Sequence, residues 1–409
     1  MVDKNLFLHD LAVVAILKDE GHYLKEWLDY HLLAGVDHFY LYDNESTDNQ
    51  AEVAKPYVDA GLVDYFPAPG EAMQYAVYND AVKRFKFFNR YMAFIDSDEF
   101  IYPKLTKWGG VIDVVDEILP RDENAAGLAM HYHYFGSNGQ EKADYSRGVL
   151  ERFTRRAPND WEVNKLIKTI ADPRKIKFFW DPHTMSYFEP FHTVDENLKI
   201  ATDSKPLPVL TEKIVVNHYY TKSKEEYIKT KVQRGWACAV RNPYGDERFN
   251  ERDRNEEFDD GILKYRAARA QNFSLENDVE RFNRVTEALM ETLSAYASGK
   301  KFSIETALIC RALSTYLRER FPNDAEYWKI CEETSLKAIL QSLGSELNLA
   351  EANLFVRELP ELLRLSHPVI KEIRIAGQQI ISQLMNIARV RANWLHYTEL
   401  DCFREFLKE

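Results

Sequence analysis

The first 100 residues alternate between short apolar segments and amphipathic segments, and this alternation limits the possible folds more than any other feature. Apolar or aromatic segments that predict strands lie at 11–17, 37–43, 62–68 and 91–100. The segments between them, 21–35, 46–61 and 73–87, have the spacing or capping residues of helices. Short strand–helix–strand repeats predict a largely parallel sheet with helices on both faces. We therefore expect an α/β fold that binds its ligands at the carboxyl ends of the strands.

The pattern changes twice further along the chain. Residues 111–220 mix strand and helix signals with long polar connections. Residues 241–260 are rich in charges of both signs, which is typical of a solvated linker or an exposed helix. From about residue 262 the apolar residues follow helical spacing only. The sequence thus predicts an α/β domain over 1–240, a charged linker over 241–260 and an all-helical domain over 261–409.

Charge and cysteine content restrict the partners and the compartment. The net charge of −12 argues against a nucleic-acid partner, because such surfaces are normally basic. The apolar run LAVVAIL at 11–17 is too short to span a bilayer, and no other segment reaches that length. The four cysteines have no spacing typical of a zinc site or a disulfide framework. We expect a cytoplasmic protein without a transmembrane segment, and peripheral attachment to a membrane stays open.

Three carboxylates crowd the end of the fourth predicted strand, in YMAFIDSDEF. Asp96, Asp98 and Glu99 lie within four positions, where like charges raise one another's pKa unless a cation or hydrogen bonds relieve them. Removing one of these three carboxylates should relieve the repulsion among them. A solvated turn would also explain the cluster. A divalent cation fits the expected fold better, because ligands of open α/β sheets bind at strand ends.

Two other strand ends carry polar groups. Asp43 and Asn44 follow the second strand, where they could accept hydrogen bonds from a nucleoside or cap the next helix. His218 ends a later apolar strand and is either a structural residue or a ligand for a Mn²⁺-type ion, and Lys222 after it could face phosphates. The sequence lacks a glycine-rich dinucleotide loop and a Walker motif. A nucleotide would therefore be held by a metal and by side chains.

Five segments, in this order, resemble glycosyltransferase family 92 and related bacterial family-2-like enzymes. They are AILKDEGHYLKEWLDYHLLAGVDHFYLYDNESTDN, YMAFIDSDEFIYP, HYFGSNG, LIKTI and NHYYTKSKEEYIKT. The resemblance covers about residues 10–235 and leaves 260–409 uncovered. It implies a GT-A fold, a nucleotide-sugar donor such as UDP-galactose or UDP-glucose, a glycan acceptor, and inverting transfer of a hexose helped by Mn²⁺ or Mg²⁺.

The resemblance also implies roles for single residues. The metal ligands would be Asp96, Asp98 and His218. The donor site would include Glu20, Asp43, Asn44, Asp96 and Lys222. The acceptor loop would include Phe135, Gly136 and Gly139. Gln140 stands where many relatives have a histidine, so the choice of acceptor cannot be carried over.

The general base and the role of the helical domain stay open at this point. Inversion needs a group that takes the proton of the acceptor hydroxyl. Glu189 is the first candidate for this base, with Asp144 and Asp195 as alternatives. The helical domain could form a homodimer, bind a partner or help hold the acceptor. Three other functions remain possible: a sugar nucleotidyltransferase, a metal-dependent phosphohydrolase and a non-catalytic glycan-binding or scaffold protein.

Overall fold

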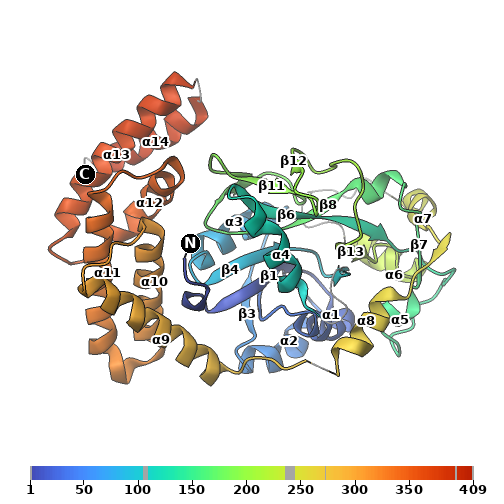
Figure 1. Cartoon of the computed structure of the whole chain (residues 1–409). Coiled ribbons are helices and arrows are strands. Elements are labelled where there is room, and N and C mark those ends of the chain that lie inside the picture. The colour runs from blue at the N-terminus through green and yellow to red at the C-terminus, as the bar shows by residue number, and fades with distance from the viewer. Residues whose placement is uncertain (1, 105–108, 235–244, 272, 392–393, 408–409) are drawn as a thin grey trace. The chain divides into compact units, whose positions relative to one another are not determined.

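The computed structural model describes residues 2–104, 109–234, 245–271, 273–391 and 394–407 (Figure 1). Contacts divide the chain into two compact units. The sheet unit comprises His9–Tyr187 and Phe191–Asp278, and the helical unit comprises Met1–Leu8, Phe188–Pro190 and Val279–Glu409. The expected α/β fold followed by an all-α region is confirmed.

The sheet unit is built on one mixed sheet in which parallel pairs predominate at the N-terminal strands. The strand order is β12-β11-β6-β8-β4-β1-β2-β3. Strand β1 pairs in parallel with β2 and β4, and β2 pairs in parallel with β3, whereas β8 runs antiparallel between β4 and β6. The strands of this path are β1 (His9–Leu17), β2 (His38–Asp43), β3 (Val63–Pro67), β4 (Asn89–Phe94), β6 (Ala125–Tyr134), β8 (Ile167–Ala171), β11 (His192–Val194) and β12 (Ile200–Ala201).

Shorter strands and helices complete the sheet unit. Strand β13 (Ile214–His218) pairs with β6 in parallel and with β5 (Glu99–Pro103) in antiparallel direction. The remaining strands are β7 (Arg155–Arg156), β9 (Ile176–Phe179), β10 (Met185–Tyr187) and β14 (Glu257–Phe258). The helices are α1 (Gly21–Leu33), α2 (Gln50–Asp59), α3 (Gln74–Phe85), α4 (Val111–Ile118), α5 (Val149–Arg152), α6 (Lys224–Tyr227), α7 (Asp246–Arg252) and α8 (Gly261–Arg269).

Side chains of β1 alternate between two apolar cores, one on each face of the sheet. Leu11, Val13, Ala15 and Leu17 pack into the core that contains residues of α1, α4 and α8. Ala12, Val14 and Ile16 pack into the core that contains residues of α3. A strand that is buried on both sides reads as a continuous apolar run, which is why LAVVAIL lacks polar alternation. Helices on both faces of a parallel-dominated sheet are the architecture expected for a GT-A domain.

The predicted strand at 91–100 is two strands in the structure. Strand β4 ends at Phe94, and β5 begins at Glu99 after a turn in which the amide of Glu99 donates to the carbonyl of Asp96 (3.1 Å). Strand β5 then pairs with β13, more than 100 residues later in the chain. The apolar pattern of the segment does not show this change of partner. The carboxylates at 96–99 therefore lie in the turn between two strands.

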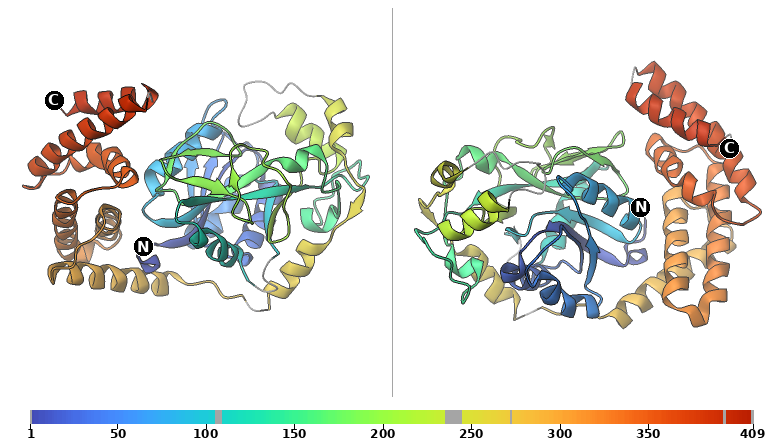
Figure 2. Two further views of the ribbon diagram at one scale, coloured as in Figure 1. Left: turned by 45° about the horizontal axis from the view of Figure 1, so that its top comes forward. Right: turned by 180° about the vertical axis from the view of Figure 1, so that it is seen from behind.

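Among its described residues the helical unit has helices and no strands, and its part from Val279 onward is drawn in golden orange to red in both views of Figure 2. They are α9 (Asp278–Ala297), α10 (Ile304–Arg320), α11 (Ala325–Leu343), α12 (Leu349–Leu362), α13 (Ile370–Val390) and α14 (Trp394–Phe406). Each of the first five buries an apolar face. In the described part of the chain, no helix is both long enough and apolar enough to span a membrane.

The compact sheet unit ends later than the boundary expected at 241–260. It runs to Asp278 and includes helix α8, which the sequence analysis placed in the helical domain. Ile262 and Tyr265 of this helix are buried in the core of the sheet unit. The Tyr265 hydroxyl donates to the carbonyl of Gly109 (3.0 Å). Residues 235–244, which include the first part of the expected linker, lie outside the described residues.

Two truncations test this boundary. A chain that ends after Asp278 is expected to unfold cooperatively, because it keeps the whole sheet unit. A chain that ends after Asp259 loses Ile262 and Tyr265, and deletion of buried side chains of this size costs about 2–5 kcal/mol each. Urea denaturation followed by circular dichroism should therefore show a much lower midpoint for the shorter chain. Equal midpoints would place the boundary near Asp259 after all.

Candidate active site

A cavity of about 860 Å³ lies at the carboxyl ends of β1, β2 and β4. Its lining includes Glu20 after β1, Asn44 after β2, and Asp96, Asp98 and Glu99 after β4. Tyr132 and His183 border it from β6 and from the turn between β9 and β10, and His218 borders it from β13. All these residues belong to the sheet unit. The cavity lies where the sequence analysis expected the ligands of this sheet.

Asp98 is the more deeply buried of the two carboxylates of the DSD motif, with 3% of its surface exposed. Its Oδ2 accepts from Nζ of Lys231 (2.5 Å), and its Oδ1 lies 3.5 Å from Nε2 of His218. Burial alone would raise the pKa of Asp98, but the charges of Lys231 and His218 outweigh it and hold the pKa well below its ordinary value. Asp98 is therefore ionised at neutral pH.

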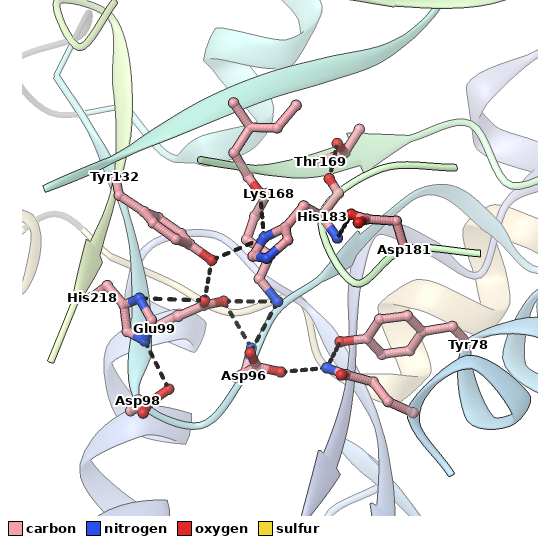
Figure 3. A network of polar contacts seen from close by, with 12 residues as sticks. Tyr78, Asp96, Asp98, Glu99, Tyr132, Lys168, Thr169, Asp181, His183 and His218 are labelled. Atoms are coloured by element: carbon pink, nitrogen blue, oxygen red, sulfur yellow. Dashed lines mark hydrogen bonds and ion pairs between the residues drawn. The ribbon is translucent and has the colours of Figure 1, made fainter. Parts of the chain in front are cut away.

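Asp96 and Glu99 share a second buried lysine (Figure 3). Nζ of Lys168 lies 3.0 Å from Oδ2 of Asp96 and 3.3 Å from Oε2 of Glu99. Oδ1 of Asp96 accepts from Gln74 (2.8 Å). Oε1 of Glu99 accepts from the hydroxyl of Tyr132 (2.5 Å). The repulsion among the three carboxylates is thus relieved by two lysines and by hydrogen bonds.

Burial and the charges of this cluster together raise the pKa values of both Lys168 and Glu99. Burial would lower the pKa of Lys168, but Asp96 and Glu99 outweigh it and hold the pKa well above its ordinary value. Burial raises the pKa of Glu99, and the attraction of Lys168 only partly offsets this effect. Lys168 is therefore a permanent cation beneath the cavity.

Asp98 and His218 have a spacing that suits a shared divalent cation. Two ligand atoms at about 2.1 Å from one ion lie roughly 3.0–3.5 Å apart, and Oδ1 of Asp98 and Nε2 of His218 are separated by 3.5 Å. Within the described residues, no group of three His, Cys, Asp or Glu side chains is placed so as to hold a metal ion. The protein itself thus offers two ligands, and a cation here would need further oxygens from a bound nucleotide or water.

The structure brings some of the predicted donor-site residues to the cavity. Glu20 lines it and pairs with Arg234 (2.6 Å), which lies just after the π-helical turn Ile228–Gln233. Asn44 lines it and donates both amide hydrogens to the carbonyls of Ala68 and Gly70 (2.7 and 2.8 Å). The side-chain oxygen of Asn44 is therefore left as an acceptor with a fixed orientation.

Asp43 and Lys222 have other surroundings. Oδ1 of Asp43 accepts from the amide of Ser46 (3.0 Å) and from Gln50 (3.2 Å), which are local contacts of the kind expected for a capping residue. Lys222 is buried with its Nζ 4.4 Å from the ring centre of Tyr23. Among the described residues, neither side chain lines the cavity. Their roles in donor binding stay predictions.

The predicted acceptor loop is tightly packed. Phe135 is fully buried and stacks on Tyr219 at 4.6 Å between ring centres. A Cβ atom at Gly136 would lie 2.3 Å from the carbonyl oxygen of Arg254, and Gly139 has a φ of +73°. Both positions therefore require glycine. Among the described residues, the cavity lining includes none of the three, so their contact with an acceptor stays a prediction.

The three candidates for the general base lie apart from the described cavity lining. Glu189 belongs to the helical unit, where its exposed carboxylate pairs with Arg391. Asp195 accepts from the amides of Asn197 and Lys199 (2.8 and 3.0 Å). Asp144 accepts from the hydroxyl of Ser146 (2.6 Å). A catalytic role for any of them stays a prediction.

Several residues of the site were not predicted from the sequence: Tyr132, His183, Lys231 and Arg234 line the cavity, and Lys168 is a buried neighbour that pairs with Asp96 and Glu99. Lys168 offered a usable signal, because it interrupts the apolar run LIKTI and a lysine is almost never fully buried unless it is paired. Lys231 and Arg234 lie in a basic, polar segment that gives no comparable signal.

Comparison with known proteins identifies a family match over most of the sheet unit. Residues 14–259 match the glycosyltransferase family 92 model. A family 92 protein of Ricinus communis is 29% identical over 147 residues, which are 36% of this chain and 26% of that protein. A family 92 protein of rice (Oryza sativa subsp. japonica) is 26% identical over 213 residues, or 52% and 33% of the two chains. This chain therefore spans about a quarter to a third of the length of these relatives.

A galactan beta-1,4-galactosyltransferase of Arabidopsis thaliana is 33% identical over 89 residues, or 19% of this chain and 17% of that one. Among solved structures, S. aureus TarS 1–349 in complex with UDP is 13% identical with a TM-score of 0.31, covering 90% of both chains. Glucosyl-3-phosphoglycerate synthase from Mycobacterium tuberculosis, in complex with Mn²⁺, UDP and glucosyl-3-phosphoglycerate, is 16% identical with a TM-score of 0.24, covering 41% of this chain and 58% of that one. Scores this low do not extend the likeness to individual site residues.

Proposed function

The chain belongs to glycosyltransferase family 92, and we propose that it transfers a hexose from a nucleotide-sugar to a hydroxyl of a glycan acceptor, with inversion at the sugar carbon. The proposed donor is a UDP-sugar such as UDP-galactose or UDP-glucose, bound with Mn²⁺ or Mg²⁺. The observation that carries the proposal is the pair of Asp98 and His218 at the floor of a cavity at the strand ends. The cavity volume of about 860 Å³ falls in the range of small-molecule sites, roughly 300–1,000 Å³.

The charges around the cavity suit a diphosphate. Its lining holds both the DSD carboxylates and the basic residues Lys231, Arg234 and Arg252. A divalent cation held by Asp98 and His218 would supply Lewis-acid stabilisation of the charge on the leaving diphosphate. Lys231 and Arg234 would pair with phosphate oxygens, since both lie beside carboxylates that a cation would partly neutralise.

The buried lysine and the fixed amide would position the two ends of the donor. Lys168 holds the carboxylates of Asp96 and Glu99 in one arrangement below the diphosphate. The side-chain oxygen of Asn44 would accept a hydrogen bond from the nucleobase or ribose, because its amide hydrogens are already used by Ala68 and Gly70. Pre-oriented groups of this kind reduce the reorganisation that binding requires.

A donor screen tests the proposal. We expect release of UDP from UDP-galactose or UDP-glucose in the presence of Mn²⁺, at a rate well above that with GDP-mannose. Removal of the cation with EDTA should stop UDP release and weaken UDP binding measured by calorimetry. Readdition of Mn²⁺ should restore both.

The same assay distinguishes the other functions. A nucleotidyltransferase would instead form a nucleotide-sugar and pyrophosphate from UTP and a sugar 1-phosphate. A phosphohydrolase would release inorganic phosphate from p-nitrophenyl phosphate. A non-catalytic protein would leave all donors intact. Any of these results, together with absence of sugar transfer, would contradict the proposed function.

A further inference from the structure

His183 borders the cavity from the turn between β9 and β10. Its backbone is held on both sides. The carboxylate of Asp181 accepts from the amide of His183 (2.8 Å), and the hydroxyl of Thr169 in β8 donates to the carbonyl of His183 (3.0 Å). The backbone of His183 is therefore held between Asp181 and Thr169 (Figure 3).

The hydrogen bonds of the ring define its tautomer. Nδ1 of His183 lies 3.0 Å from the carbonyl oxygen of Ile167, which can only accept. Nδ1 therefore carries the hydrogen, and Nε2 of the neutral ring carries a lone pair. The hydroxyl oxygen of Tyr132 lies 3.4 Å from the same Nδ1. Among the described residues, Nε2 of His183 has no hydrogen-bond partner.

Four carboxylates of the cavity lining are already engaged with cations. Asp98 pairs with Lys231, and Asp96 and Glu99 pair with Lys168. Glu20 pairs with Arg234. Each of these carboxylates would have to break a salt bridge before it could take up a proton. The imidazole of His183 offers a lone pair without that cost.

His183 also lies close to the proposed leaving-group site. The ring of Tyr132 is 6.1 Å from the ring of His183 and 4.8 Å from the ring of His218, measured between centres. His183 and the proposed metal ligand His218 are thus contacts of the same tyrosine. A sugar whose diphosphate is held at Asp98 and His218 would have its reacting carbon within reach of this part of the wall.

We propose that His183 is the general base of the transfer, which rests on the proposed function. The hydroxyl proton of the acceptor moves to Nε2 of His183. The hydroxyl oxygen forms a bond to the anomeric carbon, the bond from that carbon to the diphosphate oxygen breaks, and its electron pair leaves with the diphosphate. The imidazolium then returns its proton to solvent.

The electrostatic surroundings keep the ring neutral before the substrate binds. Burial, and next the ammonium of Lys168, lower the pKa of His183 to about 4, against the opposite effects of Asp181 and Asp96. Tyr132 is the other ionisable group that faces the ring, and burial holds its pKa well above the ordinary value, so it stays neutral. The base is therefore unprotonated at neutral pH.

The test uses UDP-galactose as donor and water as acceptor, so that no acceptor glycan has to be known. Asparagine at position 183 places an amide N–H near the position of Nδ1 and keeps the donor to Ile167, but offers no base at Nε2. We expect His183→Asn to lower the rate of UDP release by about 10²–10⁴-fold, with the Kd for UDP within about twofold of wild type. The matched control is His192→Asn, on β11 and paired with Asp122 outside the cavity lining, which should retain the wild-type rate.

Two further measurements separate a base from a structural role. Imidazole added to His183→Gly should restore part of the activity. In the wild-type chain, kcat/KM should fall as the pH approaches about 4, the pKa of the imidazole in the free protein, and His183→Asn should lack this acid limb. ¹⁵N NMR at pH 7 should show a neutral His183 ring protonated at Nδ1.

The outcomes are distinguishable. An active wild-type chain with an equally active His183→Asn variant would overturn the assignment and leave the proposed function standing. If ¹⁵N NMR of the wild-type chain at pH 7 showed His183 as an imidazolium, or as a neutral ring protonated at Nε2, the assignment would be overturned as well. This measurement does not depend on the folding of the variant. A wild-type chain that turns over no nucleotide-sugar would overturn the proposed function itself.

Discussion

Asp98→Asn is expected to lower the free energy of unfolding by about 3–5 kcal/mol without metal and to remove cation-dependent UDP binding. The ion pair of Asp98 with Lys231 is almost wholly buried, with side-chain exposures of 4% and 13%. Breaking such a pair leaves one charge in a poorly solvated place, and this penalty is larger than the net gain of forming the pair. Urea denaturation in EDTA and calorimetry with UDP and Mn²⁺ measure the two effects.

Lys231→Met provides the control for the stability effect. If the loss in Asp98→Asn comes from the buried ammonium, adding Lys231→Met should recover much of it, and the double-mutant cycle should show a coupling of about 1–3 kcal/mol. UDP binding should not recover, because the proposed cation ligand is still missing. An unchanged stability of Asp98→Asn would mean that the pair is solvated in solution.

The pH dependence of the Asp98 contribution has a defined sign. The pKa of Asp98 in the folded chain is well below its ordinary value. Its stabilising effect is therefore complete above the unfolded-state pKa of about 3.9 and is lost as the pH falls toward the folded-state value. The difference in stability between wild type and Asp98→Asn should thus be constant from pH 7 to about pH 5 and should shrink below pH 4.

The predicted loss of stability in Asp98→Asn is the reverse of the expectation from the sequence, in which removing one crowded carboxylate relieves repulsion. The crowding of Asp96, Asp98 and Glu99 was visible in the sequence, but the cations that neutralise it were not. Lys168 lies 70 residues after Asp98 and Lys231 lies 133 residues after it. Such pairs depend on tertiary structure, and a sequence pattern reports only neighbours along the chain.

The fold was more accessible from the sequence than the site. Alternation of apolar and amphipathic segments was enough to predict the strands near 11–17, 37–43 and 62–68 and the helices between them. It did not separate β4 from β5, because both are apolar and only their pairing partners differ. Nor did it assign α8, whose amphipathic pattern would suit either unit and whose Ile262 and Tyr265 pack on the sheet unit.

Within the site, the strand ends were the productive signal. Glu20, Asn44, Asp96, Asp98 and His218 each follow or end a strand, and the structure brings them to one cavity. His183 follows a short strand in a long polar region, where a single histidine carries no pattern. Its proposed role depends on the carbonyl of Ile167 and on the cations that occupy the neighbouring carboxylates, which only the tertiary structure shows.

Glu226→Gln is the second substitution with a large expected effect, about 3–5 kcal/mol of lost stability. The two terminal nitrogens of the Arg152 guanidinium, Nη1 and Nη2, donate to Glu226 (2.8 and 2.6 Å), and the two side chains are 2% and 0% exposed. Burial would raise the pKa of Glu226, but the hydrogen bonds from Arg152 and Ser223 outweigh it and hold the pKa below its ordinary value. Glutamine has one acceptor oxygen and no charge, so it leaves the buried guanidinium of Arg152 without its counterion.

The loss should extend to the cavity, because Glu226 lies in α6, directly before the π-helical turn of Ile228–Gln233 that carries Lys231. We therefore expect Glu226→Gln to weaken UDP binding although its side chain is outside the cavity lining. Asp59→Asn is the matched control, since it removes an exposed ion pair with Lys55 and such pairs contribute about 1 kcal/mol or less. Chemical denaturation and UDP titration of both variants provide the comparison. Similar small losses of stability in the two variants would show that the buried pair contributes no more than a surface pair. A loss of UDP affinity in Glu226→Gln alone would instead identify α6 as a support of the cavity side that carries Lys231.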